Sequence, residues 1–136
     1  MRTPVSLPFS PMNGENAVAA LEKSRAQLLT RHGVRTLAPG EPGYRGRYEG
    51  PLSERDAAYH QGTAWPWLLG SLVSAIVRLT GNRSVAQAIL DDAAGWLSEY
   101  GLGGIAEVYD GDEPQFPGGC PWQAWSIAEV LRAYVE

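Results

Sequence analysis

Apolar residues recur at helical spacing in four stretches of the chain, and two long stretches rich in glycine and proline interrupt them. The spacing predicts helices over about residues 15–30, 63–79, 84–100 and 122–134. In the second of these helices the apolar side chains form a broad stripe, so it is expected to be buried on most sides. No stretch predicts a β-strand. The fold class expected from the pattern is therefore all-α.

The two irregular stretches, residues 31–58 and 101–121, are long for a compact domain, and loops of this length tend to carry function. An aromatic segment, residues 59–67 (Tyr-His-Gln-Gly-Thr-Ala-Trp-Pro-Trp), follows the first. The second contains residues 106–111 (Ala-Glu-Val-Tyr-Asp-Gly). Aromatic and amide side chains can hold sugar rings, and a carboxylate can serve acid/base chemistry. Together the two motifs point to carbohydrate chemistry, with one clear carboxylate of the two that hydrolysis needs.

Composition narrows the class of protein. The chain has 136 residues, 44% of them hydrophobic and 19% charged, which is typical of one globular domain. Its net charge of -4, with scattered Lys and Arg, argues against a nucleic-acid partner. The most apolar predicted helix contains Gly70 and Ser71 and is short for a membrane span. A single cysteine and an N-terminus unlike a signal peptide favour a cytoplasmic location.

Four collinear stretches of the chain resemble the C-terminal part of glycogen debranching enzymes, the amylo-α-1,6-glucosidase domain. They are residues 6–11 (Ser-Leu-Pro-Phe-Ser-Pro), 44–50 (Tyr-Arg-Gly-Arg-Tyr-Glu-Gly), 59–67 and 107–131. The last stretch includes Tyr-Asp-Gly-Asp at 109–112 and Gly-Cys-Pro-Trp-Gln-Ala-Trp-Ser at 119–126. The resemblance implies an (α/α)6 toroid and an inverting hydrolase that frees glucose from α-1,6 branch stubs of an α-glucan, without a cofactor. It also implies that Glu107 is the general base.

The chain departs from that family in two respects. Twelve helices with their loops need roughly 200 residues, and the upstream Trp-Met-Asp-Ala-like motif that carries the family's general acid does not occur here. Residues 1–136 are therefore interpreted as a single incomplete domain, the C-terminal portion of the toroid. The expected partner is the missing N-terminal part, in cis or as a separate chain. We expect the isolated chain to be inactive, and the helix over 63–79 to expose an apolar face that promotes self-association.

The remaining site candidates each have a structural alternative. His60 and Gln61 can hydrogen-bond sugar hydroxyls, although a lone histidine is often structural. Of Trp65 and Trp67, one is expected to stack on a glucose ring and the other to pack in the core. Two further candidates come from the irregular stretches. Tyr48 either shapes the pocket or fixes its loop, and Asp110 either contacts substrate or closes an Asp-Gly turn.

Other classes of function stay open at this point. The second interpretation is a non-catalytic helical carbohydrate-binding or accessory module, and a further alternative is a glucoamylase-like or trehalase-like enzyme of the same toroid type. Two histidines and one cysteine exclude a zinc site. The spacing of the acids matches no calcium loop, so no metal is expected.

Overall fold

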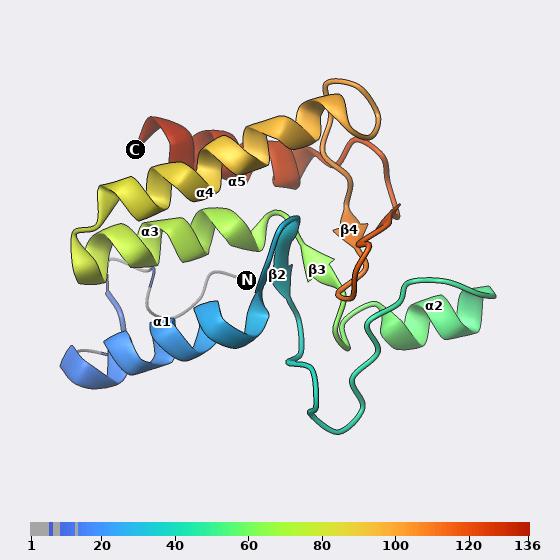
Figure 1. Ribbon diagram of the computed structural model, residues 1–136, viewed down its shortest axis with the longest axis horizontal. Helices are drawn as coiled ribbons and strands as arrows, with labels where there is room; N and C mark the ends of the chain where they lie inside the picture. The colour runs from blue at the N-terminus through green and yellow to red at the C-terminus, as the bar shows by residue number, and fades with distance from the viewer. Residues whose placement is uncertain (1–5, 7–8, 13) are drawn as a thin grey trace.

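The computed structural model describes residues 6, 9–12 and 14–136. In this part of the chain helices are combined with a five-stranded antiparallel sheet, so the protein is mixed α/β (Figure 1). The all-α prediction is wrong, and with it the fold class of an (α/α)6 portion. The strands are two or three residues long. That length is too short to produce the alternation of apolar and polar residues by which strands are recognised in a sequence.

The elements follow one another in a simple order. They are α1 (Gly14–Leu28), β1 (Leu29–Thr30), β2 (Gly33–Arg35), α2 (Leu52–Ala58), β3 (Ala64–Trp65), α3 (Leu68–Thr80), α4 (Arg83–Gly95), a 3₁₀ turn (Trp96–Ser98), β4 (Val108–Tyr109), β5 (Pro117–Gly118) and α5 (Ala124–Val135). The sequence pattern does not predict α2. This helix has seven residues, and only Ala58 among them is buried.

Helix α3 is the centre of the helical part. It contacts α1 on one side and α4 and α5 on the other (Figure 1). Its Leu69, Leu72, Val73 and Ile76 are all at most 3% exposed, as the broad apolar stripe predicts. The expectation that this helix presents an apolar face to solvent is therefore wrong. Several large exposed apolar side chains lie instead on α5, at Trp125, Leu131, Tyr134 and Val135.

The N-terminal boundary of α3 differs from its prediction. Residues 64–65 form β3, and the helix begins only at Leu68. The cause is strand pairing, because Trp65 pairs with Val34 of β2 and Ala64 pairs with Tyr109 of β4. At its other end the helix stops where the sequence indicates, with Gly81 in the left-handed conformation (φ 67°).

The sheet brings the two sequence motifs together. Its strands run in the order β1-β2-β3-β4-β5, and Figure 1 shows them at one end of the helices. The pairing of β3 with β4 places the 59–67 segment beside the loop that contains Glu107. Ala64, Ala106 and Tyr109 form a small buried cluster at this junction.

The two motifs also contact each other at Gly62 and Gly111. The backbone of Gly111 lies so near Gly62 that a Cβ atom on Gly111 would stand 2.0 Å from the Gly62 carbonyl oxygen. The Gly111 amide donates to the Gly46 carbonyl (2.8 Å), and its own carbonyl accepts from Arg35 Nε (2.8 Å). Three segments distant in sequence therefore meet at this glycine.

No helix in the described ranges has both the length and the hydropathy needed to cross a membrane.

Candidate active site

The Glu107 carboxylate is held at both of its oxygens. Glu107 lies directly before β4 and is half-buried. Its Oε1 accepts a hydrogen bond from the Tyr59 hydroxyl, and its Oε2 accepts one from the Cys120 amide (3.0 Å). The Glu107 amide donates in turn to the Cys120 carbonyl (2.9 Å). A carboxylate has about four lone-pair sites, so this arrangement fixes its direction and still leaves acceptor capacity for a water molecule.

Tyr59 is the side chain that orients Glu107. It follows the last residue of α2, and its ring lies near that of Tyr48 (5.6 Å between centroids). Burial and the adjacent Glu107 carboxylate raise the pKa of the Tyr59 hydroxyl above its ordinary value. The phenol therefore stays protonated at neutral pH and remains a hydrogen-bond donor to Glu107.

Trp65 is the most buried residue of an aromatic cluster beside Glu107, which also contains Tyr59, His60, Trp67 and Trp125. It is 2% exposed, and its Nε1 donates to the Tyr59 carbonyl (3.1 Å). The Tyr59 ring meets it edge-on at 4.8 Å, and the His60 ring stacks on it at 5.0 Å. Because Trp65 is enclosed by these neighbours, it cannot offer its own face to a ligand and instead supports the residues around it.

The accessible aromatic side chains of the cluster are Trp67 and Trp125. Trp67 immediately precedes α3 and is half-buried, whereas Trp125 in the first turn of α5 is 49% exposed. Their ring centroids are 5.9 Å apart. Since Trp125 also contacts Trp65 (6.2 Å), α5 contributes to the same surface as the 59–67 segment.

The other predicted site residues lie around this cluster. His60 and Gln61 are exposed, at the turn between α2 and β3. Tyr48 is half-buried, with its ring against Tyr59. Asp110 is only 4% exposed and accepts hydrogen bonds from the Tyr48 amide (2.7 Å) and from Arg47 Nη1 (3.1 Å). The structure therefore brings Glu107, His60, Trp65, Trp67 and Tyr48 into one region, and Asp110 is bonded to it through the Tyr48 amide.

The family model described as amylo-alpha-1,6-glucosidase matches residues 1–132. The chain belongs to this family. It is thus a C-terminal domain of the glycogen debranching type, related to glycoside hydrolases, as the four resembling stretches predict. Glu107, His60 and both tryptophans of the 59–67 segment lie inside the matched range.

Two residues of this amylo-α-1,6-glucosidase domain are missed as site candidates by sequence reasoning. Tyr59 opens the aromatic motif, but its contact with Glu107 depends on α2, which the sequence pattern does not predict. Trp125 has the spacing of an apolar helix position, which masks its place on the surface. The signal that could have found it is its position within the matching stretch, in a chain with five tryptophans.

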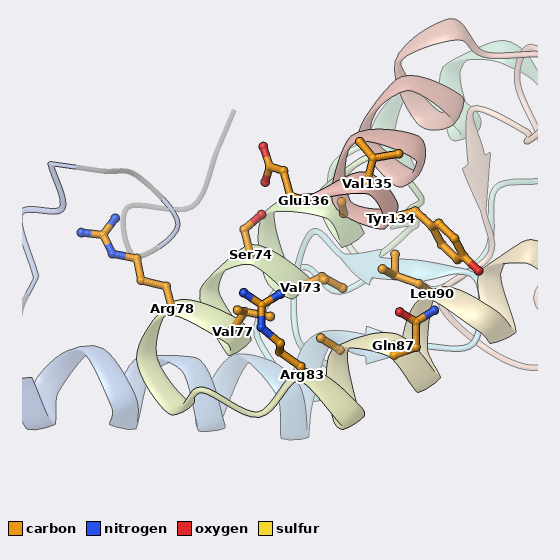
Figure 2. Close-up of a pocket in the computed structure, with 12 residues that line it drawn as sticks. Val73, Ser74, Val77, Arg78, Arg83, Gln87, Leu90, Tyr134, Val135 and Glu136 are labelled. Atoms are coloured by element: carbon orange, nitrogen blue, oxygen red, sulfur yellow. The ribbon is translucent and has the colours of Figure 1, made fainter.

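A separate hollow lies at the other end of α3. It has a volume of about 540 Å³ and is lined by α3, α4 and the end of α5, including Ser74, Arg83 and Tyr134 (Figure 2). None of the predicted site residues lines it. Within the described residues, no group of three or more His, Cys, Asp or Glu is arranged to hold a metal ion.

The amylo-α-1,6-glucosidase domain should lose stability at alkaline pH, in part through Tyr44. Its hydroxyl donates to Asp112 Oδ1 (2.7 Å), and burial together with that carboxylate raises its pKa to about 12. Below pH 10 the Tyr44 hydroxyl is neutral in both the folded and the unfolded state. Between pH 10 and 12 the unfolded chain loses this proton first. The stabilisation from this group is therefore present below pH 10 and lost as pH rises through 12.

Urea unfolding at pH 8 and pH 11 tests this expectation. Tyr44→Phe should lower the free energy of unfolding at pH 8, and the difference from wild type should shrink at pH 11. A difference that is equal at both pH values would contradict the linkage.

Proposed function

We propose that this domain binds a branched α-glucan at the surface around Glu107, Trp67 and Trp125. In this proposal Glu107 is the general base of an inverting α-1,6-glucosidase site. The observation that carries the proposal is the Glu107 carboxylate, oriented by Tyr59 and the Cys120 amide beside a cluster of aromatic rings. The family match supports the class of enzyme.

In the proposed reaction Glu107 takes a proton from a water molecule as the water oxygen attacks the anomeric carbon. The bond from that carbon to the glycosidic oxygen breaks, and a carboxylic acid on the opposite face protonates the departing oxygen. Inversion needs the two carboxyl groups about 6.5–9.5 Å apart, so that the water fits between the base and the sugar. Tyr59 would keep Glu107 aimed at this water.

The general acid is proposed to come from another polypeptide segment, in cis or from a separate chain. Asp110 follows Glu107 closely in sequence, but both of its oxygens already accept hydrogen bonds, one of them from a guanidinium. With both oxygens engaged as acceptors and only 4% of the residue exposed, Asp110 is poorly placed to reach a glycosidic oxygen. We therefore expect this chain alone to release little or no glucose from a branched limit dextrin.

The sugar would contact the exposed side chains around Trp65. Trp67 and Trp125 offer aromatic faces, and His60 and Gln61 offer donors and acceptors for hydroxyl groups. Trp65 and Tyr48 would shape the surface from behind.

Glucan affinity tests this surface. Trp125→Ala should weaken binding of a branched limit dextrin about tenfold, because one stacking face is lost. Tyr134→Ala is the matched control, since Tyr134 lies on the same helix with similar exposure (53% against 49%). Tryptophan fluorescence or calorimetry would measure the dissociation constants. Equal affinities for wild type and both variants would contradict the proposed site.

A non-catalytic carbohydrate-binding module is the second candidate function. The exposure of Trp125 and His60 favours it, because an open aromatic surface can bind glucan without chemistry. Under this alternative Glu107→Gln changes no rate and only Trp125→Ala changes binding. Comparison of α-1,4-linked, α-1,6-linked and trehalose ligands would separate a debranching specificity from a glucoamylase-like or trehalase-like one.

A further inference from the structure

Asp110 is the centre of a buried hydrogen-bonded connection between two loops. Its Oδ1 accepts from the Tyr48 amide (2.7 Å) and its Oδ2 from Arg47 Nη1 (3.1 Å). Behind the side chain, the Asp110 amide donates to the Phe116 carbonyl (2.9 Å), and its carbonyl accepts from Gln115 Nε2 (3.3 Å). The backbone of Asp110 is thus held by its own loop, and its carboxylate binds the neighbouring loop that contains Arg47 and Tyr48.

Other contacts lay the same two loops against each other. The Gly46 carbonyl accepts from the amides of Gly111 (2.8 Å) and Asp112 (3.2 Å). Arg47 also donates through Nη2 to the Glu113 carbonyl. The segment around Tyr48 therefore has little freedom to move away from the loop that follows β4.

These bonds also bear on the position of the Tyr48 ring. A Cβ atom on Gly118 would stand 2.7 Å from that ring, so the ring is in close contact with β5. On its other side the ring lies against Tyr59, whose hydroxyl donates to Glu107. Asp110 holds the backbone of Tyr48, Tyr48 supports Tyr59, and Tyr59 orients Glu107.

We propose that Asp110 is a positioning residue, which sets the sugar-binding surface through Tyr48 and makes no contact with the sugar itself. Its 4% exposure leaves no free face for a ligand, and both of its oxygens are turned to groups of the protein. The inference rests on the proposed function in that the surface it shapes is the glucan site.

A double-mutant cycle with Tyr48 separates positioning from direct contact. Asp110→Asn should weaken limit-dextrin binding about tenfold in the wild-type background and change it less than twofold in a Tyr48→Ala background. A direct contact predicts the same loss in both backgrounds, and this result would overturn the proposal. No loss in either background would overturn it as well. Asp91→Asn is the control, because Asp91 is an exposed acid of α4 whose Oδ1 accepts a local bond from Gln87.

A spectroscopic measurement keeps this test independent of glucan binding. With ¹³C-labelled tyrosine, the ring resonances of Tyr48 and Tyr59 should shift in Asp110→Asn and stay in place in Asp91→Asn. If wild type binds no glucan and the ring resonances still shift in Asp110→Asn, the proposed function fails while the positioning of Tyr48 by Asp110 is supported. Unmoved rings overturn the positioning role whatever the affinity. Should Asp110→Asn not fold, Arg47→Gln removes one of the two bonds at a more exposed position and takes its place in both measurements.

Discussion

Hydrolysis of α-D-glucosyl fluoride by the folded wild-type chain should fall at least 100-fold when Glu107 becomes glutamine. Fluoride leaves without protonation, so this substrate needs a general base but no general acid. Glu107 would take a proton from water, the water oxygen would bond to the anomeric carbon, and fluoride would depart with the electron pair of the broken bond. General-base assistance contributes about 10²–10⁴ in rate, and the amide of glutamine cannot supply it.

Fluoride release and the anomeric form of the product are the measurements. The expected product is β-glucose, identified by NMR before it equilibrates. Glu113→Gln is the control, as Glu113 is an exposed glutamate of the loop that follows β4. Hydrolysis that persists in Glu107→Gln would show that Glu107 is not the base. Glucose release from a limit dextrin by this chain alone would show that it holds its own acid, and the proposal of an acid from elsewhere would be wrong.

Gly111→Ala should lower the free energy of unfolding by about 2 kcal/mol or more. The new methyl carbon would stand 2.0 Å from the Gly62 carbonyl oxygen. That neighbour is backbone, so no side-chain rotation can relieve the overlap. The two motifs must move apart, which also strains the hydrogen bonds of Gly111 to Gly46 and Arg35.

Urea denaturation of the two proteins would give this difference. Gly95→Ala is the control, because a Cβ atom there meets no other atom within 4 Å and the residue lies in the last turn of α4. This control should leave stability unchanged or slightly raised, since alanine is the better helix former. Equal stabilities of Gly111→Ala and wild type would mean that the close approach is not rigid.

The helical part of the fold is the part that the sequence predicts best. The core of α3 follows from its apolar stripe, and Gly81 ends it as expected. The strands escape detection because their stability comes from pairing partners far along the chain. Ala64 pairs with Tyr109, and no local pattern around either residue indicates this. Tertiary contact therefore decides between helix and strand at residues 64–65.

The candidate site, like the fold, is predicted only in part from the sequence. Motif resemblance selects Glu107, and the structure supplies its partners, Tyr59 and the Cys120 amide. Asp110 is identified as part of the site region, but its burial and its bond to Arg47 depend on a loop about sixty residues earlier. Residue type and spacing indicate which chemistry is available. They do not indicate which face of a side chain remains open. The sequence leaves undecided which of Trp65 and Trp67 packs in the core, whereas in the structure Trp65 is buried and Trp125 of α5 is exposed.

The short strands at the two ends of the sheet have a consequence for aggregation. A long exposed strand offers unpaired amides and carbonyls on which a second chain can add its own strand. Here the outer strands β1 and β5 have two residues each, and β5 contains Pro117, which has no amide hydrogen to offer. The sheet therefore gives little template for intermolecular pairing, although it has two free edges.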